Sequence, residues 1–219
     1  MTVRLHRGGR FRAWVGGRLG GGATLGDRVL RIGLHIAGSV VLLYYLLPPN
    51  FFVVFSNEAG LLLALGAVLA VEVLRHAARI ELPTIRPYER ERVASFAFFA
   101  VALVISVLVF PKPVAVAVVL GTALIDPLSG ELRFRGRSRA TTWLVPILAY
   151  ALLAAVIFRW VGGWAVASAV VAALGAAVVA VAIERPKWGW YDDDFGMTLV
   201  PGVVLTLTLW LWPGFPGGG

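Results

Sequence analysis

The chain has 219 residues, of which 59% are hydrophobic and only 15% are charged. Soluble domains average about 45–50% apolar and about 25% charged residues, so most of this chain needs lipid as its solvent, which excludes a secreted domain, a disordered regulator and a soluble enzyme. The absence of cysteine excludes disulfides, thiolate nucleophiles and cysteine-ligated metal centres, and the net charge of +8 is interpreted as a topology signal rather than as the mark of a nucleic-acid partner.

The sequence predicts an all-α, polytopic membrane protein with about seven transmembrane helices. We expect a basic flexible arm over 1–27, one transmembrane domain over 28–212 and a Gly-rich tail over 213–219. A spanning helix needs about 20 mostly apolar residues. The candidate segments are 32–47, 58–74, 93–110, 113–126, 140–158, 163–183 and 196–212, and the breaks between them contain Pro48-Pro49, Pro83, Pro87, Pro111, Pro127, Gly162-Gly163 and Pro186.

The basic residues alternate between the two sides of this topology. Eighteen of the twenty Lys and Arg residues precede the first segment or follow the second, fourth and sixth, and only Lys112 and Arg159 lie in the other connections. The positive-inside rule therefore predicts a cytoplasmic N-terminus and, with seven spans, an external C-terminus in a multi-pass protein of the cell membrane. Most acidic residues also fall on the cytoplasmic side, a mixture of charges suited to a metal-bound polyphosphate.

Two pairs of charged residues lie near the ends of the first two segments. Arg31 and His35 are four residues apart and share one helix face, where they either take part in chemistry or contact lipid headgroups. Glu72 and Arg75 have the spacing of an ion pair that closes the second helix, which we favour over a catalytic role.

Acidic residues further along the chain are the strongest candidates for chemistry. The apolar run before Asp126 is too short to cross a bilayer, which places this carboxylate below the inner headgroups, where ionisable groups tend to face a cavity or a partner. Alternatively, Asp126 and Pro127 begin a new helix. The adjacent carboxylates of Asp192–Asp194 need a cation or an arginine, or else form a hydrated turn that caps the last helix, and Glu184 could join them.

In chain order these positions resemble the motifs of the CTP-dependent lipid kinases of membranes, which include dolichol kinase, phytol kinase and a diacylglycerol kinase and are related to phosphatidate cytidylyltransferase. Arg31 and His35 resemble the opening motif. The other similar elements are Arg86, Glu89 and Arg90 in a charged loop, the run Ile125-Asp126-Pro127-Leu128-Ser129-Gly130-Glu131, and Glu184 with Asp192–Asp194 and Pro201. Ile32, Ile125 and Asp194 differ from the residues that the family usually has there.

The resemblance implies Mg²⁺-dependent phosphoryl transfer from CTP to a polyprenol-like or dolichol-like lipid alcohol at the cytoplasmic interface. It implies catalytic roles for Asp126, His35 and Glu89 and a metal site formed by Asp126, Asp192, Asp193 and Asp194. Nucleotide or phosphate binding falls to Arg31, Arg86, Arg90, Gly130 and Arg133. The implied partners are the nucleotide, the lipid alcohol and membrane lipids, and a homo-oligomer is compatible with the sequence.

Three alternatives remain open from the sequence. A cytidylyltransferase would attack the α-phosphorus of CTP and form a CDP-lipid. A lipid transporter or scramblase would need charged groups deep within several spans, whereas the span interiors are nearly free of charge. A scaffold that grips anionic lipid would leave the clustered carboxylates without a role.

Overall fold

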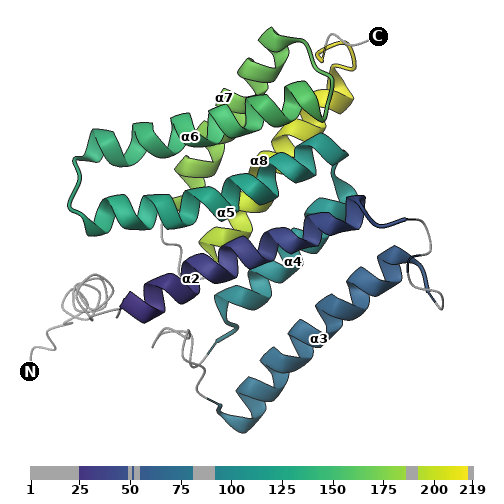
Figure 1. Cartoon of the computed structure of the whole chain (residues 1–219), viewed down its shortest axis with the longest axis vertical. Coiled ribbons are helices and arrows are strands. Elements are labelled where there is room, and N and C mark those ends of the chain that lie inside the picture. The colour runs from purple at the N-terminus through teal and green to yellow at the C-terminus, as the bar shows by residue number, and fades with distance from the viewer. Residues whose placement is uncertain (1–24, 49–50, 52–54, 81–91, 186–191, 217–219) are drawn as a thin grey trace, which may run out of the picture.

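The computed structural model describes residues 25–48, 51, 55–80, 92–185 and 192–216 (Figure 1). Within these ranges the regular structure is entirely helical, which confirms the all-α prediction. Helix α2 spans Leu25–Gly38 and continues into the 3₁₀ helix η1 (Ser39–Tyr45). The remaining helices are α3 (Asn57–Ala78), α4 (Ser95–Val109), α5 (Lys112–Phe134), α6 (Arg139–Trp160), α7 (Val166–Glu184) and α8 (Asp193–Leu211).

Each of the seven apolar segments overlaps a helix. Five helices, α3 and α5 to α8, are long and apolar enough to cross a membrane, whereas Ile32–Tyr45 and α4 are shorter apolar helices. The prediction that a helix ends at Asp126-Pro127 is wrong, because α5 continues through Pro127 to Phe134. A proline inside a helix costs about 3 kcal/mol, but Ile125 and Ser129 on either side are buried, and this packing favours the continuous helix.

Helices α5 and α8 lie in the middle of the bundle, α6 and α7 pack on one side of them, and α4 packs on α8 (Figure 1). Helix α2 lies across α5, whereas α3 lies at the periphery, where it contacts α4 and η1. Helix α4 approaches α2 closely at Gly38, where a Cβ would lie 2.6 Å from the Phe99 ring of α4. The bundle therefore has a well-packed half around α5 and α8 and a more exposed flank at α3.

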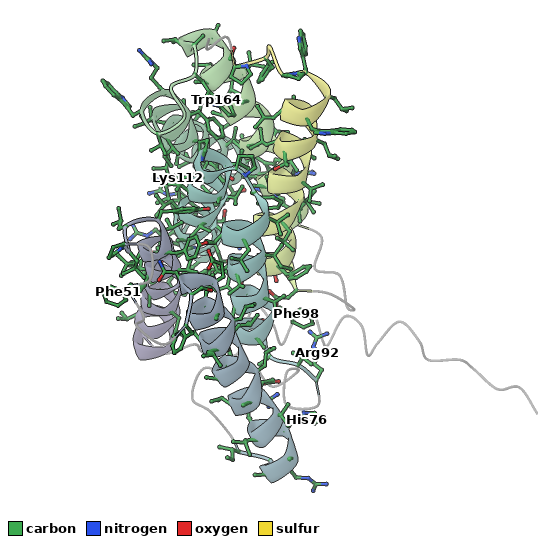
Figure 2. The ribbon with its side chains drawn as sticks, turned by 90° about the vertical axis from the view of Figure 1, so that its right-hand side faces the viewer. Phe51, His76, Arg92, Phe98, Lys112 and Trp164 are labelled. Atoms are coloured by element: carbon green, nitrogen blue, oxygen red, sulfur yellow. The ribbon has the colours of Figure 1, made fainter. Side chains whose placement is uncertain are left out.

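Consecutive helices run in opposite directions, so alternate connections lie at opposite ends of the bundle. The two ends differ in composition. Figure 2 shows His76 and Arg92 at one end and Lys112 and Trp164 towards the other. We name the first the arginine-rich end. The arginines there whose side chains are described are Arg75, Arg79, Arg92, Arg133, Arg135, Arg137, Arg139 and Arg185. The opposite end has the highly exposed indoles of Trp160, Trp210 and Trp212.

Gly202 allows α8 to pack closely on the end of α4. A Cβ at this position would overlap the ring of Phe110, which is itself buried. We expect Gly202→Ala to lower the free energy of unfolding by about 1–3 kcal/mol through overpacking, measured as thermal unfolding in detergent. Gly66→Ala in α3 is the matched control, because a Cβ there has no atom within 4 Å and alanine favours the helix. Equal unfolding temperatures for the two variants would contradict this packing.

Candidate metal centre

Three buried side chains from three helices meet near the arginine-rich end. His35 of α2 places its Nε2 atom 3.4 Å from Asp126 Oδ2 of α5 and 3.4 Å from Asp194 Oδ2 of α8. The three residues are only 7%, 7% and 5% exposed, respectively. The His35 ring also lies against Phe99 of α4, which helps to fix its position. The imidazole thus lies between two carboxylates that are 68 residues apart in the sequence.

A second group of acidic residues shares Asp126 with the first. Asp126, Glu184 of α7 and Asp193 of α8 each offer a carboxylate oxygen, and these oxygens lie within 4.8 Å of one another. His35, Asp126 and Asp194 meet the same condition. We refer to His35, Asp126, Glu184, Asp193 and Asp194 as the acidic cluster. The structure therefore brings Asp126 together with two of the three adjacent aspartates and with Glu184.

The continuous helix α5 explains how one face carries several of the candidate residues. Asp126, Gly130 and Arg133 are spaced by four and three residues, so they follow one another along the same face. Gly130 is exposed, and a Cβ there would have no atom within 4 Å, so the helix surface is open at this position. Arg133 Nη1 lies 2.5 Å from Glu184 Oε1, so the arginine that we expected to bind phosphate contacts a carboxylate of the cluster.

The three adjacent aspartates have different positions. Asp192 is the N-cap of α8, since its Oδ1 accepts a hydrogen bond from Asp194 N at 3.0 Å, and its Oδ2 accepts one from Ser95 Oγ at 2.5 Å. Asp193 faces Asp126 and Glu184, and Asp194 faces His35. Asp192 thus fits the capping interpretation, whereas Asp193 and Asp194 fit the metal-site interpretation.

The cluster combines concentrated negative charge with incomplete hydrogen bonding. Four carboxylates come together here, those of Asp126, Glu184, Asp193 and Asp194. The basic residues in contact with them are His35, at Asp126 and Asp194, and Arg133, at Glu184. Asp194 Oδ1 is buried and has no hydrogen-bond partner among the described residues. Leaving a buried acceptor unsatisfied is costly, and more so for a charged group. A donor set of several carboxylate oxygens fits Mg²⁺ or Mn²⁺.

Asp192 gives this end of the protein a pH dependence. Burial, followed by the charges of Asp194 and Asp193, raises the pKa of Asp192 to about 7. The folded protein therefore binds more protons than the unfolded chain between about pH 4 and pH 7, and its stability should fall as the pH rises through this range. We expect the unfolding temperature in metal-free buffer to fall from about pH 5 to about pH 8, and Asp192→Asn, which preserves an N-cap side chain, to reduce that slope. A rise over this range would contradict the assignment.

Some predicted site residues cannot be placed in the cluster. Arg86, Glu89 and Arg90 lie outside the described residues. Arg31 lies in α2, one turn before His35, but its side chain is also outside the description. The ion-pair interpretation of Glu72 and Arg75 is confirmed, since Arg75 Nη2 lies 2.7 Å from Glu72 Oε1.

Sequence reasoning missed three hydroxyl residues next to the acidic residues. Ser95 contacts Asp192, and the hydroxyls of Thr122 and Thr198 meet beneath the cluster. Thr122 lies four residues before Asp126, and Thr198 lies four residues after Asp194, so helical spacing from each carboxylate could have identified both.

The chain matches no protein-family model, no curated protein and no solved structure.

Proposed function

We propose that this chain is a divalent-cation-dependent membrane enzyme that transfers the γ-phosphoryl group of CTP to the hydroxyl of a polyprenol-like lipid alcohol. The observation that carries the proposal is the meeting of Asp126 with Asp193 and Asp194, near one end of a bundle of apolar helices. Carboxylates packed in this way are well suited to hold Mg²⁺, and the nucleotide specificity rests on the sequence resemblance.

In this proposal Asp126, Asp193 and Asp194 hold the cation, which when bound offsets the negative charge of the triphosphate. His35 accepts the proton of the lipid hydroxyl, and the neighbouring carboxylates of Asp126 and Asp194 stabilise the imidazolium that forms. The lipid oxygen forms a bond to the γ-phosphorus, the bond between this phosphorus and the β,γ-bridging oxygen breaks, and CDP leaves. Glu89 is a further candidate for handling the proton.

The basic residues bind the nucleotide in this proposal. Arg133 is about one third exposed on its contact with Glu184, so it lies where phosphate oxygens could also reach it. Guanidinium groups suit phosphate because they offer several donors in one plane. Arg31, Arg86 and Arg90 are assigned to the phosphates by the resemblance, and the open space at Gly130 lies on the same helix face.

The depth of the cluster suits a reaction between a soluble nucleotide and a lipid. Asp126 lies 14 residues along α5 from Lys112, or roughly 21 Å, compared with a hydrocarbon core of about 30 Å. Trp160, Trp210 and Trp212 fit an aromatic belt at the opposite interface. We include in the proposal seven spans and a cytoplasmic arginine-rich end, so that CTP reaches the cluster from the cytoplasm and the lipid reaches it from the membrane.

The experiment that tests the function supplies purified protein with Mg²⁺, a polyprenol and CTP labelled on either the γ- or the α-phosphorus. The proposal predicts labelled lipid from γ-labelled CTP only. Labelled lipid from α-labelled CTP would instead show a cytidylyltransferase. No labelled lipid with any nucleotide or lipid alcohol would contradict enzymatic transfer and favour the transport alternative.

A further inference from the structure

A pair of buried threonines joins α5 to α8 directly beneath the acidic cluster. The hydroxyl oxygens of Thr122 and Thr198 lie 3.1 Å apart, and both side chains are fully buried. Thr198 Oγ1 also donates a hydrogen bond to the main-chain oxygen of Asp194 at 2.7 Å. Because a hydroxyl has one proton, Thr122 supplies the proton shared by the two hydroxyls whenever Thr198 donates to Asp194.

The two threonines have matching positions relative to the carboxylates. Thr122 precedes Asp126 by one helical turn on α5, and Thr198 follows Asp194 by one turn on α8. Since α5 runs towards the arginine-rich end and α8 runs away from it, both threonines lie one turn deeper in the bundle than the aspartates. A contact at this level restrains sliding and rotation of α8 against α5, one turn from Asp126 and Asp194.

The aspartates themselves cannot supply this constraint. Their negative charges repel each other, and the contact described between them passes through His35. Helix α8 also packs on α4, α5 and α7, and these packing contacts surround the hydrogen bond between the two threonines. The threonine hydrogen bond adds a directional contact between α5 and α8 one helical turn from the carboxylates, where it opposes their repulsion.

We propose that Thr122 and Thr198 are positioning residues that hold Asp126 and Asp194 at cation-binding distance. The inference rests on the proposed cation site, which it deepens, and it gives the threonines no contact with substrate. Residues that support metal ligands typically change metal affinity by about 10–100-fold when they are replaced. Thr198 makes both contacts, so its loss should have the larger effect.

The first test measures Mn²⁺ binding to the full-length protein in detergent by electron paramagnetic resonance. We expect Thr198→Val to weaken binding about 10-fold or more, Thr122→Val to weaken it less, and Thr198→Ser to restore it, because serine preserves the hydroxyl. Thr208→Val is the matched control. Thr208 donates to the main-chain oxygen of Val204 with the same four-residue spacing, but it is on an exposed part of α8. Unchanged affinity in Thr198→Val, or no rescue by serine, would overturn the inference while leaving the cation site intact.

A second measurement detects the arrangement of the helices without any cation ligand. The chain has no cysteine, so Asp126→Cys and Asp194→Cys can be combined as a unique thiol pair. We expect Hg²⁺ to bridge this pair and to protect it from a maleimide, and Thr198→Val, but not Thr208→Val, to reduce that protection. If the chain without substitutions fails to bind Mn²⁺, the cation site is contradicted. The Hg²⁺ bridge then still tests whether the threonines hold α5 and α8 in place. Equal protection of the thiol pair in the Thr198→Val and Thr208→Val backgrounds would overturn the inference. Reduced protection in Thr198→Val alone would support it.

Discussion

Asp126→Asn should reduce CTP-dependent lipid phosphorylation by about 10³-fold or more without lowering the stability of the protein. Asp126 belongs to both groups of potential ligands, so the loss of its negative charge weakens cation binding in either arrangement. The same change removes repulsion among packed carboxylates, and asparagine has almost the same shape. We therefore expect the unfolding temperature in metal-free buffer to be unchanged or higher. The two measurements are the rate of phosphoryl transfer and thermal unfolding of the same preparation.

Glu131→Gln provides the control for this variant. Glu131 is on the same helix and is paired with Arg135 at 2.6 Å, but it lies outside the acidic cluster. Neutralising this carboxylate should leave the transfer rate within about twofold, because exposed ion pairs contribute little. An active Asp126→Asn enzyme would contradict the proposed mechanism. If Asp126→Asn were inactive but also strongly destabilised, the residue would have a structural role instead.

Glu72→Gln should lower the free energy of unfolding by about 3–5 kcal/mol, the usual cost of breaking a buried ion pair. Glu72 and Arg75 are only 6% and 4% exposed, and two hydrogen bonds of 2.7 Å join them. Glu72 Oε1 also accepts from Ala94 N at 2.9 Å, and Arg75 Nη2 donates to Arg92 O at 2.9 Å. The pair therefore ties the end of α3 to the segment that leads into α4. Denaturant or thermal unfolding in detergent measures the loss.

Replacing both residues distinguishes the ion pair from simple packing. Glu72→Gln leaves the Arg75 charge buried without its carboxylate, whereas the double variant Glu72→Leu with Arg75→Leu leaves no buried charge. We expect the double variant to be more stable than Glu72→Gln alone. A double variant that is less stable by the sum of two large losses would show that the main-chain contacts at Arg92 and Ala94 dominate.

Much of the fold could be predicted from the sequence because lipid imposes a simple length rule on apolar helices. Each of the seven segments overlaps a helix, and Pro111 does lie between α4 and α5. The break at Pro127 was predicted wrongly because proline penalises a helix locally, whereas burial of Ile125 and Ser129 depends on the other helices. The local sequence indicates the helix penalty of proline, but it does not indicate burial by other helices.

The site was predictable in its carboxylates but not in its pairings. Asp126 was identifiable because an ionisable residue after a short apolar run is costly within a membrane. Asp193 and Asp194 were identifiable because adjacent negative charges need a cation or an arginine. The direction of each aspartate depends on where α8 begins, at the Asp192 cap, and on how that helix packs against its neighbours. The contacts of Arg133 with Glu184 and of Thr122 with Thr198 join residues 51 and 76 positions apart, and no local pattern encodes them.

The central claim is that Asp126, Asp193 and Asp194 hold a divalent cation for nucleotide chemistry. Anomalous X-ray diffraction from crystals grown with Mn²⁺ and CTP locates such an ion directly. The account predicts a peak at ligand distance, about 2.0–2.3 Å, from the carboxylate oxygens of Asp126 and of Asp193 or Asp194, and its loss in Asp126→Asn. A fully occupied Mn²⁺ site elsewhere, with none at Asp126, would contradict the claim.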